Sequence, residues 1–225
     1  MFGLSGGYLA LTNMYTCRSM NEITYAPIRV EWAEQLTAIE HSVFSSIGTD
    51  DLLSYKDIVG YCEVFPEGGF VALDGDTPVG FGVGLLLDFD FDDPNHSLDD
   101  LTGTEGGGDH SPEGEWYYGV TIAVNPEYRK RGIGHQLYEL RKETVKKLGK
   151  RGIVAGGVIP GYSNYLHDIS ADEYIEKVKA GELYDPTLSF QLQNGFEARG
   201  AIPDYLDDPS VGNNAVLIVW ENPDY

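Results

Sequence analysis

The sequence is poor in cysteine and contains no long apolar run. Its two cysteines, Cys17 and Cys62, cannot form a disulfide framework, so we expect a reduced protein in the cytoplasm. No stretch is long and apolar enough to cross a bilayer. Residues 1–20 lack the early basic region and clean apolar core of a signal peptide. We therefore expect no membrane partner.

Basic residues are scarce as well. Fifteen lysines and arginines face 36 aspartates and glutamates, which gives a formal net charge of −21 and an isoelectric point near 4.3. Such a surface repels the phosphate backbone, so nucleic acid is excluded as a natural partner. The charge suits a cationic substrate, or an acidic surface that keeps a protein soluble in salt, and both interpretations stay open.

Many of the acidic residues lie within residues 88–115, which we interpret as an insertion in a compact domain. Its carboxylates are Asp88, Asp90, Asp92, Asp93, Asp99, Asp100, Glu105, Asp109, Glu113 and Glu115, accompanied by His96 and His110. The segment lacks the D-x-D-x-D-G run and closing Glu of a calcium loop. We therefore expect no bound metal.

The most informative stretch runs from Tyr117 to Leu148. Apolar residues at every second position from Tyr118 to Val124 predict a strand, which Asn125-Pro126 ends. The following residues carry an apolar stripe at helical spacing. Between strand and helix lies the basic, glycine-containing loop 129–134.

This loop has the chemistry of an anion site. The N–H groups in the first turn of a helix have no partner within the helix, and the helix dipole favours an anion there. Gly132 and Gly134 permit close approach, and Arg129, Lys130 and Arg131 add positive charge. A Walker loop would need a Gly-Lys-Ser/Thr ending, and a Rossmann loop would need a third glycine and an earlier position. An ordinary basic first turn on a surface helix is the remaining alternative.

The pattern Arg129-x-x-Gly132-x-Gly134, placed after Val124-Asn125-Pro126, resembles the coenzyme A loop of GNAT-type N-acetyltransferases. The resemblance implies acetyl-CoA as cosubstrate, with its pyrophosphate on the loop and its pantetheine along the strand. The implied binding residues are Ile122, Ala123, Val124, Arg129, Lys130, Arg131, Gly132, Ile133 and Gly134.

The rest of the chain fits the same architecture. We treat residues 1–22 as an extension and residues 23–225 as one domain. We expect strands at residues 23–30, 70–73, 79–87, 117–124, 153–159 and 216–220, and a further strand that starts near Phe196. We expect helices at residues 31–44, 51–64, 171–180 and 185–196, in addition to the helix after the glycine loop. This order resembles the GNAT fold, an α/β mixed sheet whose central strands splay apart. Gly80, Gly82 and Gly84 leave room on one strand face for a ligand or a packed helix.

A closer likeness is to the acetyltransferase half of proteins that fuse it to a carbon-nitrogen hydrolase. The segments that carry it are Phe65-Pro66-Glu67-Gly68, His110 before Gly114, Ile159-Pro160-Gly161-Tyr162, Ala171-Asp172-Glu173-Tyr174, Asp185-Pro186-x-Leu188-x-Phe190-Gln191 and Trp220-x-Asn222-Pro223. With the sequence ending at Tyr225, we expect no hydrolase half. Two positions depart from the pattern: Val158 stands where the fused group has Arg, and Gln191 stands where many GNAT enzymes have a tyrosine acid.

Acyl transfer to an amine needs an oxyanion donor and a route for the amine proton. The resemblance places the donor on the strand near Ile122–Val124. Candidates for proton transfer are His110, Glu115, Tyr117, Tyr118 and Tyr162, with His110 or Glu115 preferred; the aromatic residues are equally ordinary core residues. Gln191 can hydrogen-bond but cannot act as an acid, so we expect it to orient the reacting groups.

Two functions follow from these observations. The first is an acetyl-CoA-dependent N-acetyltransferase that acts on a small amine, expected to be cationic, or on a protein amine. The second is a non-catalytic acyl-CoA-binding regulatory module, which Gln191 makes conceivable. A homodimer is one expectation for the assembly.

Overall fold

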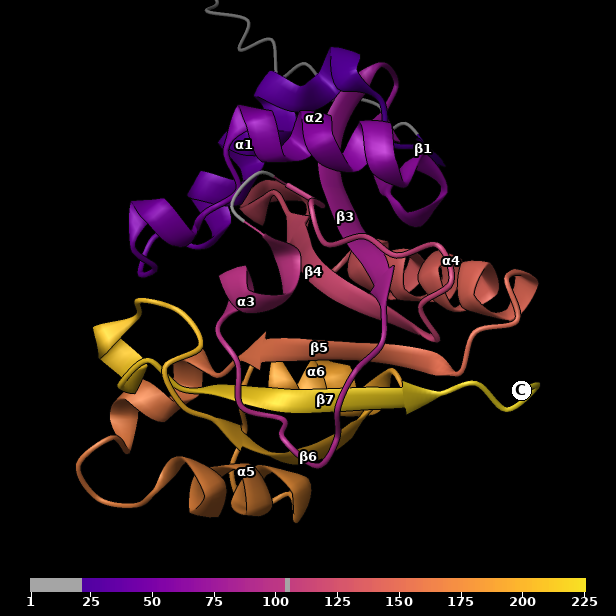
Figure 1. Cartoon of the computed structure of the whole chain (residues 1–225). Coiled ribbons are helices and arrows are strands. Elements are labelled where there is room, and N and C mark those ends of the chain that lie inside the picture. Colours follow the sequence, from indigo (N-terminus) through magenta and orange to yellow (C-terminus); the bar gives the residue numbers. More distant parts are fainter. Residues whose placement is uncertain (1–21, 104–105) are drawn as a thin grey trace, which may run out of the picture.

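The computed structural model describes residues 22–103 and 106–225, so the expected extension 1–22 lies almost entirely outside the described residues. A seven-stranded mixed sheet runs through the molecule in the order β1-β2-β3-β4-β5-β7-β6 (Figure 1). The strands are β1 Ile23–Pro27, β2 Phe70–Asp74, β3 Thr77–Leu87, β4 Trp116–Val124, β5 Gly152–Val158, β6 Glu197–Ile202 and β7 Ala215–Glu221. The expected mixed α/β fold is confirmed.

The sheet opens in its middle, between β4 and β5. All neighbouring strands are antiparallel except this pair, which is parallel. Its pairing covers only Trp116↔Gly152, Tyr117↔Ile153 and Tyr118↔Val154. Beyond that point β4 continues to Val124 alongside β3, and β5 continues to Val158 alongside β7. The two strands therefore diverge, as the expected splay requires.

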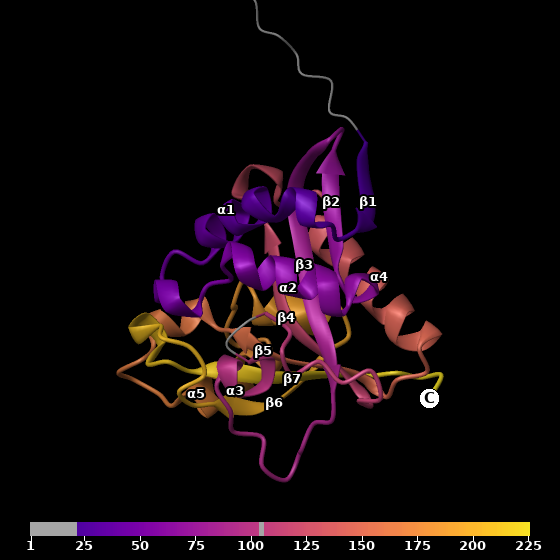
Figure 2. The ribbon, with the colours of Figure 1, turned by 45° about the horizontal axis from the view of Figure 1, so that its top comes forward.

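Helices cover both faces of the sheet (Figures 1 and 2). Helices α1 Ala33–Val43, α2 Tyr55–Val64 and α3 Leu98–Thr102 pack on one face, and α4 Ile133–Lys147, α5 Ala171–Lys179 and α6 Leu188–Gln193 pack on the other. Helix α4 fills the room left by the β3 glycines: a Cβ at Gly80 would lie 3.3 Å from Ile133, and one at Gly82 would lie 2.8 Å from the Arg141 guanidinium. Gly80 and Gly82 thus serve helix packing, whereas a Cβ at Gly84 would overlap the Tyr117 ring of β4.

Element boundaries differ from the expected ones where local chemistry intervenes. Strand β1 stops at Pro27, which has no N–H for the ladder, and a 3-10 turn at Val30–Trp32 precedes α1. Helix α2 starts at Tyr55 because Ser54 and Asp57 form a capping box. The insertion, expected as a loop, contains α3, which is capped in the same way by Ser97 and Asp100.

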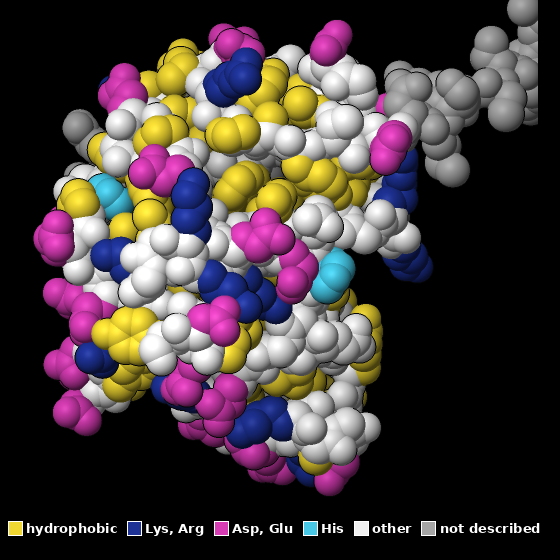
Figure 3. Space-filling model, turned by 90° about the vertical axis from the view of Figure 1, so that its right-hand side faces the viewer, with side chains coloured by type: hydrophobic (Ala, Val, Ile, Leu, Met, Phe, Trp, Pro, Cys, Tyr) yellow, Lys and Arg dark blue, Asp and Glu magenta, His cyan; other side chains and the backbone are white. Residues whose placement is uncertain are grey.

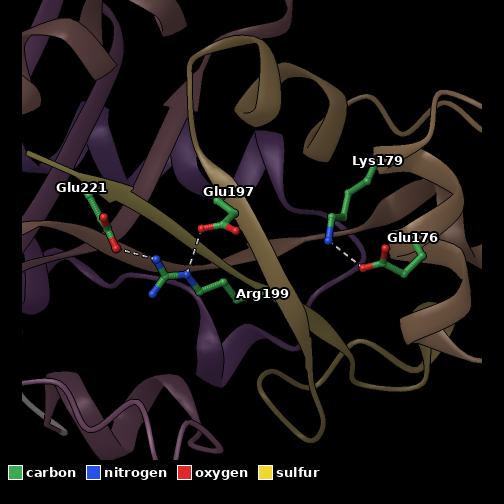
Figure 4. Close-up of polar contacts among 5 residues, drawn as sticks. All are labelled: Glu176, Lys179, Glu197, Arg199 and Glu221. Carbon is green, nitrogen blue, oxygen red and sulfur yellow. Dashed lines mark hydrogen bonds and ion pairs between the residues drawn. The ribbon is translucent and has the colours of Figure 1, made fainter. Parts of the chain in front are cut away.

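The insertion crosses the open part of the sheet and reaches its β6 edge (Figure 1). The Phe91 ring lies 5.0 Å from that of Trp116, and the Arg199 guanidinium lies 5.3 Å from the Phe91 ring. Arg199 also pairs with Glu197 at 3.2 Å and Glu221 at 2.7 Å (Figure 4). Those carboxylates are exposed, so these ion pairs contribute little to stability, whereas the aromatic contacts anchor the insertion.

Asp185 organises the chain that leads into α6. The side chain is fully buried, and its Oδ2 accepts hydrogen bonds from the Gly161 N–H at 2.9 Å and the Tyr174 hydroxyl at 3.0 Å. Its Oδ1 accepts from the N–H groups of Thr187 and Leu188, both at 2.8 Å. A single carboxylate therefore ties the end of β5 to α5 and caps α6.

We predict that Asp185→Ala lowers the free energy of unfolding by on the order of 3 kcal/mol, because it leaves buried donors without an acceptor. Asp185→Asn should lose less, since the amide oxygen still accepts from the α6 N–H groups. Chemical denaturation measures both. Asp168→Ala, at an exposed site, is the matched control and should stay near wild type; an equal loss in that control would contradict the assignment.

Candidate active site

A cavity of about 790 Å³ passes through the opening between β4 and β5. Its walls come from both faces of the sheet: the first turns of α4 and the helix α6 on one side, and α1 with the start of the loop after β6 on the other. The strand backbone between them belongs to Gly119–Ile122 of β4 and Ala155–Val158 of β5. The cavity therefore has one end on each face of the sheet, and different elements line the two ends.

The first end is the loop before α4. Gly132 is the helix N-cap with φ +79°, and a Cβ there would meet nothing within 4 Å. The first bond within the helix runs from the Gln136 N–H to the Gly132 carbonyl at 3.0 Å, so the preceding N–H groups have no helical acceptor. Lys130 has φ +62°, a left-handed conformation that is uncommon outside glycine. The loop thus presents N–H donors to open space.

The structure brings most of the expected coenzyme residues together on this end. Those that line the cavity are Ile122, Val124, Arg129, Lys130, Gly132, Ile133 and Gly134. Ala123 is fully buried outside the lining, and the Arg131 guanidinium lies 5.1 Å from the Tyr128 ring.

Positive charge is concentrated along α4 and the segments that flank it, in an otherwise acidic protein. Figure 3 views the α4 side and shows lysines and arginines gathered across the middle of that face. Nine of the 15 basic residues fall between residues 129 and 151: Arg129, Lys130, Arg131, Arg141, Lys142, Lys146, Lys147, Lys150 and Arg151. An anion approaching α4 therefore meets the least repulsive part of the surface.

Glu40 of α1 is the most distinctive group at the opposite end. It is 4% exposed, lines the cavity, and accepts a hydrogen bond at 3.0 Å from the Thr121 hydroxyl of β4. Burial raises the pKa of Glu40 to about 8, although hydrogen bonds from Thr121 and the Leu53 backbone oppose the rise. A carboxyl with that pKa exchanges protons close to neutral pH.

The sequence interpretation missed Glu40. Its signal was present, because Glu40 lies four residues after Leu36 and therefore shares the apolar face of α1. A carboxylate on an apolar helix face is either buried with a partner or functional.

Two more carboxyl groups line the same end. Asp208 is 6% exposed and accepts from the Ser46 hydroxyl at 3.0 Å. Asp51, partly exposed, accepts from the Asp207 N–H at 2.5 Å. With Glu40 they make the α1 end acidic, opposite the basic α4 end.

Gln191 lies on the coenzyme side of the cavity. It is 5% exposed, and its Oε1 is buried without a hydrogen-bond partner. A Cβ on Gly157 of β5 would come within 2.6 Å of that oxygen, so the amide rests directly on the strand. Beside it, burial raises the pKa of the Tyr138 phenol, while the Arg141 charge and a hydrogen bond from Gln191 lower it. Gln191 therefore holds a free acceptor inside the cavity.

The other proton-transfer candidates lie outside the cavity lining. The His110 Nδ1 accepts from the Leu86 N–H at 3.1 Å, its ring stacks on Phe65 at 4.8 Å, and burial lowers its pKa. Glu115 is exposed and forms an ion pair with Arg151 at 3.2 Å. These contacts engage both side chains in holding the insertion to the sheet.

The three tyrosine candidates are buried or largely buried, with their hydroxyls engaged. The Tyr117 hydroxyl donates to the Gly68 carbonyl at 2.6 Å, and that of Tyr162 donates to the Ile169 carbonyl at 2.9 Å. Tyr118 is fully buried and bonds to Tyr205 at 2.9 Å and to His96 at 2.8 Å. This last set connects to the cavity through Tyr205, which lines it.

A β-bulge in β4 lies where the sheet opens. Thr121 pairs with Val83 and Gly119 pairs with Gly84, so Val120 is an extra residue in β4. The buried Arg141 guanidinium reaches this region from α4 and donates to the carbonyls of Thr121 and Val83. Bulge and guanidinium together fix the strand backbone where the cavity crosses it.

Within residues 22–103 and 106–225, no three His, Cys, Asp or Glu side chains are grouped to hold a metal ion. In the same part of the chain, no helix has the length and apolarity to cross a membrane.

We predict that Glu40 makes stability depend on pH. Between about pH 4.5 and pH 8 the folded protein keeps a proton that the unfolded chain releases, so the free energy of unfolding falls as pH rises. Glu40→Gln should remove that part of the slope. Denaturation at pH 6 and pH 9 measures it, with exposed Glu34→Gln on the same helix as control. A slope unchanged by Glu40→Gln would show that the carboxyl is not buried as described.

Sequence and structure comparisons agree on the family. A model described as "Acetyltransferase (GNAT) family" matches residues 31–160. The chain is 40% identical over 171 residues to "Probable hydrolase YhcX" of Bacillus subtilis (strain 168), a match that covers 76% of this chain and 33% of that protein. It is 36% identical over 197 residues to "Uncharacterized N-acetyltransferase YkwB" of the same organism, with 85% of each covered. The chain thus spans about a third of the first relative and most of the second.

Solved structures show the same fold. The loading GNATL domain of CurA from Lyngbya majuscula superposes with a TM-score of 0.80 at 21% identity, covering 91% of this chain and all of that one. The GphF GNAT-like decarboxylase in complex with isobutyryl-CoA gives 0.72 at 20% identity, covering 90% and 100%. With the family model matching more than half of its length, and a relative aligned over most of it, the chain belongs to the GNAT acetyltransferase family.

Proposed function

We propose that the protein is an acetyl-CoA-dependent N-acetyltransferase whose acceptor is a small cationic amine. One observation carries the proposal: a single cavity runs from the N–H groups and cations before α4, through the open sheet, to the buried carboxyl of Glu40. A pyrophosphate suits the first end and an amine suits the second. The opening between β4 and β5 is where the two substrates would meet.

The residues present fit coenzyme A. The first turn of α4 offers N–H donors without acceptors, and the open space at Gly132 allows phosphate oxygens to approach them. Arg129 and Lys130 are exposed beside the loop and line the cavity, so they can neutralise a pyrophosphate. The free backbone edge of β4 beyond Tyr118 can hydrogen-bond an amide-containing chain such as pantetheine.

The chemistry asks one group to take a proton from the amine and another to support the departing thiolate. The ionised form of Glu40, whose share grows as the pH approaches its pKa of about 8, is suited to take a proton from a bound ammonium. Gln191 cannot supply a proton as an acid, and its buried, unpartnered Oε1 suits an orienting role.

The acidic end supports a cationic acceptor. Glu40, Asp51 and Asp208 line the cavity there, and the insertion contributes Leu98 to the same wall. The carboxylates of Asp51 and Asp208 attract a protonated amine and select against an anionic one, and Glu40 adds to that attraction in its ionised form. A surface adapted to salt explains exposed acids such as Asp92 but does not explain a carboxyl that is 4% exposed.

Coenzyme A release in the presence of acetyl-CoA and a panel of amines tests the proposal. We expect turnover with small cationic amines, and a fall of about 100-fold or more in kcat for Glu40→Gln, as for a lost general base. The Glu34→Gln control should keep wild-type kinetics. Calorimetry separates the alternative of a non-catalytic binding module, which binds acetyl-CoA yet releases no thiol with any amine.

A second experiment addresses the acceptor. Asp51→Asn keeps an oxygen for the Asp207 N–H but removes a charge from the cavity. We expect KM for the cationic amine to rise several-fold while KM for acetyl-CoA stays unchanged, and wild-type kcat/KM for the amine to fall as salt exceeds about 0.1 M. Asp50→Asn, an exposed neighbour outside the cavity lining, is the matched control. Equal effects in both variants would argue for general surface charge.

A further inference from the structure

We propose that His96, in the acidic insertion, is the outlet of a proton relay that begins at Tyr205 in the cavity and passes through Tyr118. This relay rests on the proposed acetyl transfer and deepens it, because it gives the proton released during C–N bond formation a path out of a buried site. It also gives the insertion a role in the reaction.

The relay is a continuous chain of short hydrogen bonds. The Tyr205 and Tyr118 hydroxyl oxygens are 2.9 Å apart, and the Tyr118 hydroxyl lies 2.8 Å from the His96 Nε2. The other ring nitrogen, Nδ1, lies 2.7 Å from the Pro94 carbonyl oxygen. Three side chains from β4, the insertion and the loop after β6 thus form one line.

The direction of every bond in this line follows from its last member. A carbonyl oxygen can only accept, so the His96 Nδ1 carries a proton and donates it to Pro94. In a neutral ring Nε2 is then an acceptor, and the Tyr118 hydroxyl donates to it. Tyr118 therefore accepts from Tyr205, whose oxygen keeps a lone pair that can accept a further hydrogen bond.

The neutral state of His96 is consistent with its surroundings. Partial burial lowers its pKa, against the opposing effects of the Pro94 hydrogen bond and the Asp100 carboxylate. The Phe89 ring meets the imidazole edge-on at 5.5 Å. Tyr61 is the further titratable group that interacts with Tyr118. At neutral pH the line is therefore set to receive a proton.

Tyr205 places the start of the relay at the opening of the sheet. It is 2% exposed and lines the cavity. Its ring rests on Gly156 of β5, where a Cβ would overlap it, and the Gly156 backbone also hydrogen-bonds the hydroxyl. One acceptor position then remains on the oxygen. Since β4–β5 pairing ends at Val154, this oxygen lies where the two strands part.

The proton transfers balance along the line. The N–H bond of the amine breaks as Tyr205 gains a proton, while Tyr205 passes its own proton to Tyr118 and Tyr118 passes its own to His96 Nε2. No oxidant or further reactant is needed, and each tyrosine ends neutral. The imidazolium, which is partly exposed, returns the proton to solvent. Glu40 removes the first proton of the ammonium, and the relay removes the second.

The competing account is that these bonds only anchor the insertion. It predicts that His96→Gln, which retains an acceptor for Tyr118, leaves the rate and its pH profile unchanged. The relay predicts a fall in kcat of about tenfold or more at neutral pH, with KM for acetyl-CoA unchanged. It also predicts the shape of the pH profile. In both proteins log kcat should fall with slope one below the Glu40 pKa. Below the His96 pKa the fall should become steeper in wild type but not in His96→Gln.

The decisive experiment combines this profile with nitrogen-15 NMR of His96 in the intact protein. We expect the Nδ1–H tautomer and a titration midpoint below 6.5. Tyr118→Phe should match His96→Gln in rate, and the double variant should be no slower, because both break one path. His167→Gln, at an exposed histidine, is the matched control and should change nothing.

Two results would overturn the relay. An Nε2–H tautomer would reverse the bond directions, and it would do so whether or not any amine is acetylated. A His96→Gln variant that keeps the wild-type rate and the steep acidic limb would leave only the anchoring role. Absence of thiol release by the wild-type protein, with the expected tautomer present, would instead count against the proposed transfer reaction.

Discussion

The early end of β4–β5 pairing is the constraint on which the rest of the structure depends. Parallel strands that stay paired leave no space between them, but here the ladder stops at Tyr118↔Val154 and each strand follows its other neighbour. The bulge at Val120 and the Arg141 guanidinium fix the backbone of β4, and the Tyr205 ring packs on Gly156 of β5. The cavity passes through that separation, with the loop before α4 at one end and Glu40 at the other.

Local patterns explain how far sequence reasoning reached. The strand–loop–helix unit around Gly132 could be recognised because each of its requirements, the strand end, the left-handed glycine and the orphan N–H groups, is set within a few residues. The start of α2 was misplaced by a few residues because Ser54 caps the helix, and α3, which Ser97 caps, was not predicted at all. A capping box is a short-range signal, so α3 was in principle predictable.

The end of the cavity that contains Glu40 was harder to predict because long-range contacts create it. Glu40 and Thr121 are 81 residues apart in sequence, and His96 meets Tyr118 and Tyr205 only after the insertion has folded back. His110 was a candidate for proton transfer because it is a titratable loop residue. In the structure its Nδ1 accepts a hydrogen bond from the Leu86 N–H. Which titratable side chain faces a cavity depends on tertiary packing, and a single sequence does not encode that in its local periodicity.

The narrow link between the two halves of the sheet has a consequence for how the chain assembles. Strands β1 to β4 come from residues 23–124, and β5 to β7 come from residues 152–221, so each half-sheet draws on one continuous stretch of chain. The β4–β5 ladder joins the half-sheets through only three residue pairs, and α4 packs against both. The remaining strand pairing lies within one half or the other, although its partners are far apart in sequence, as with Ile23↔Asp74 and Gly152↔Glu221. Residues of both halves line the cavity, so it is complete only where the two halves are docked.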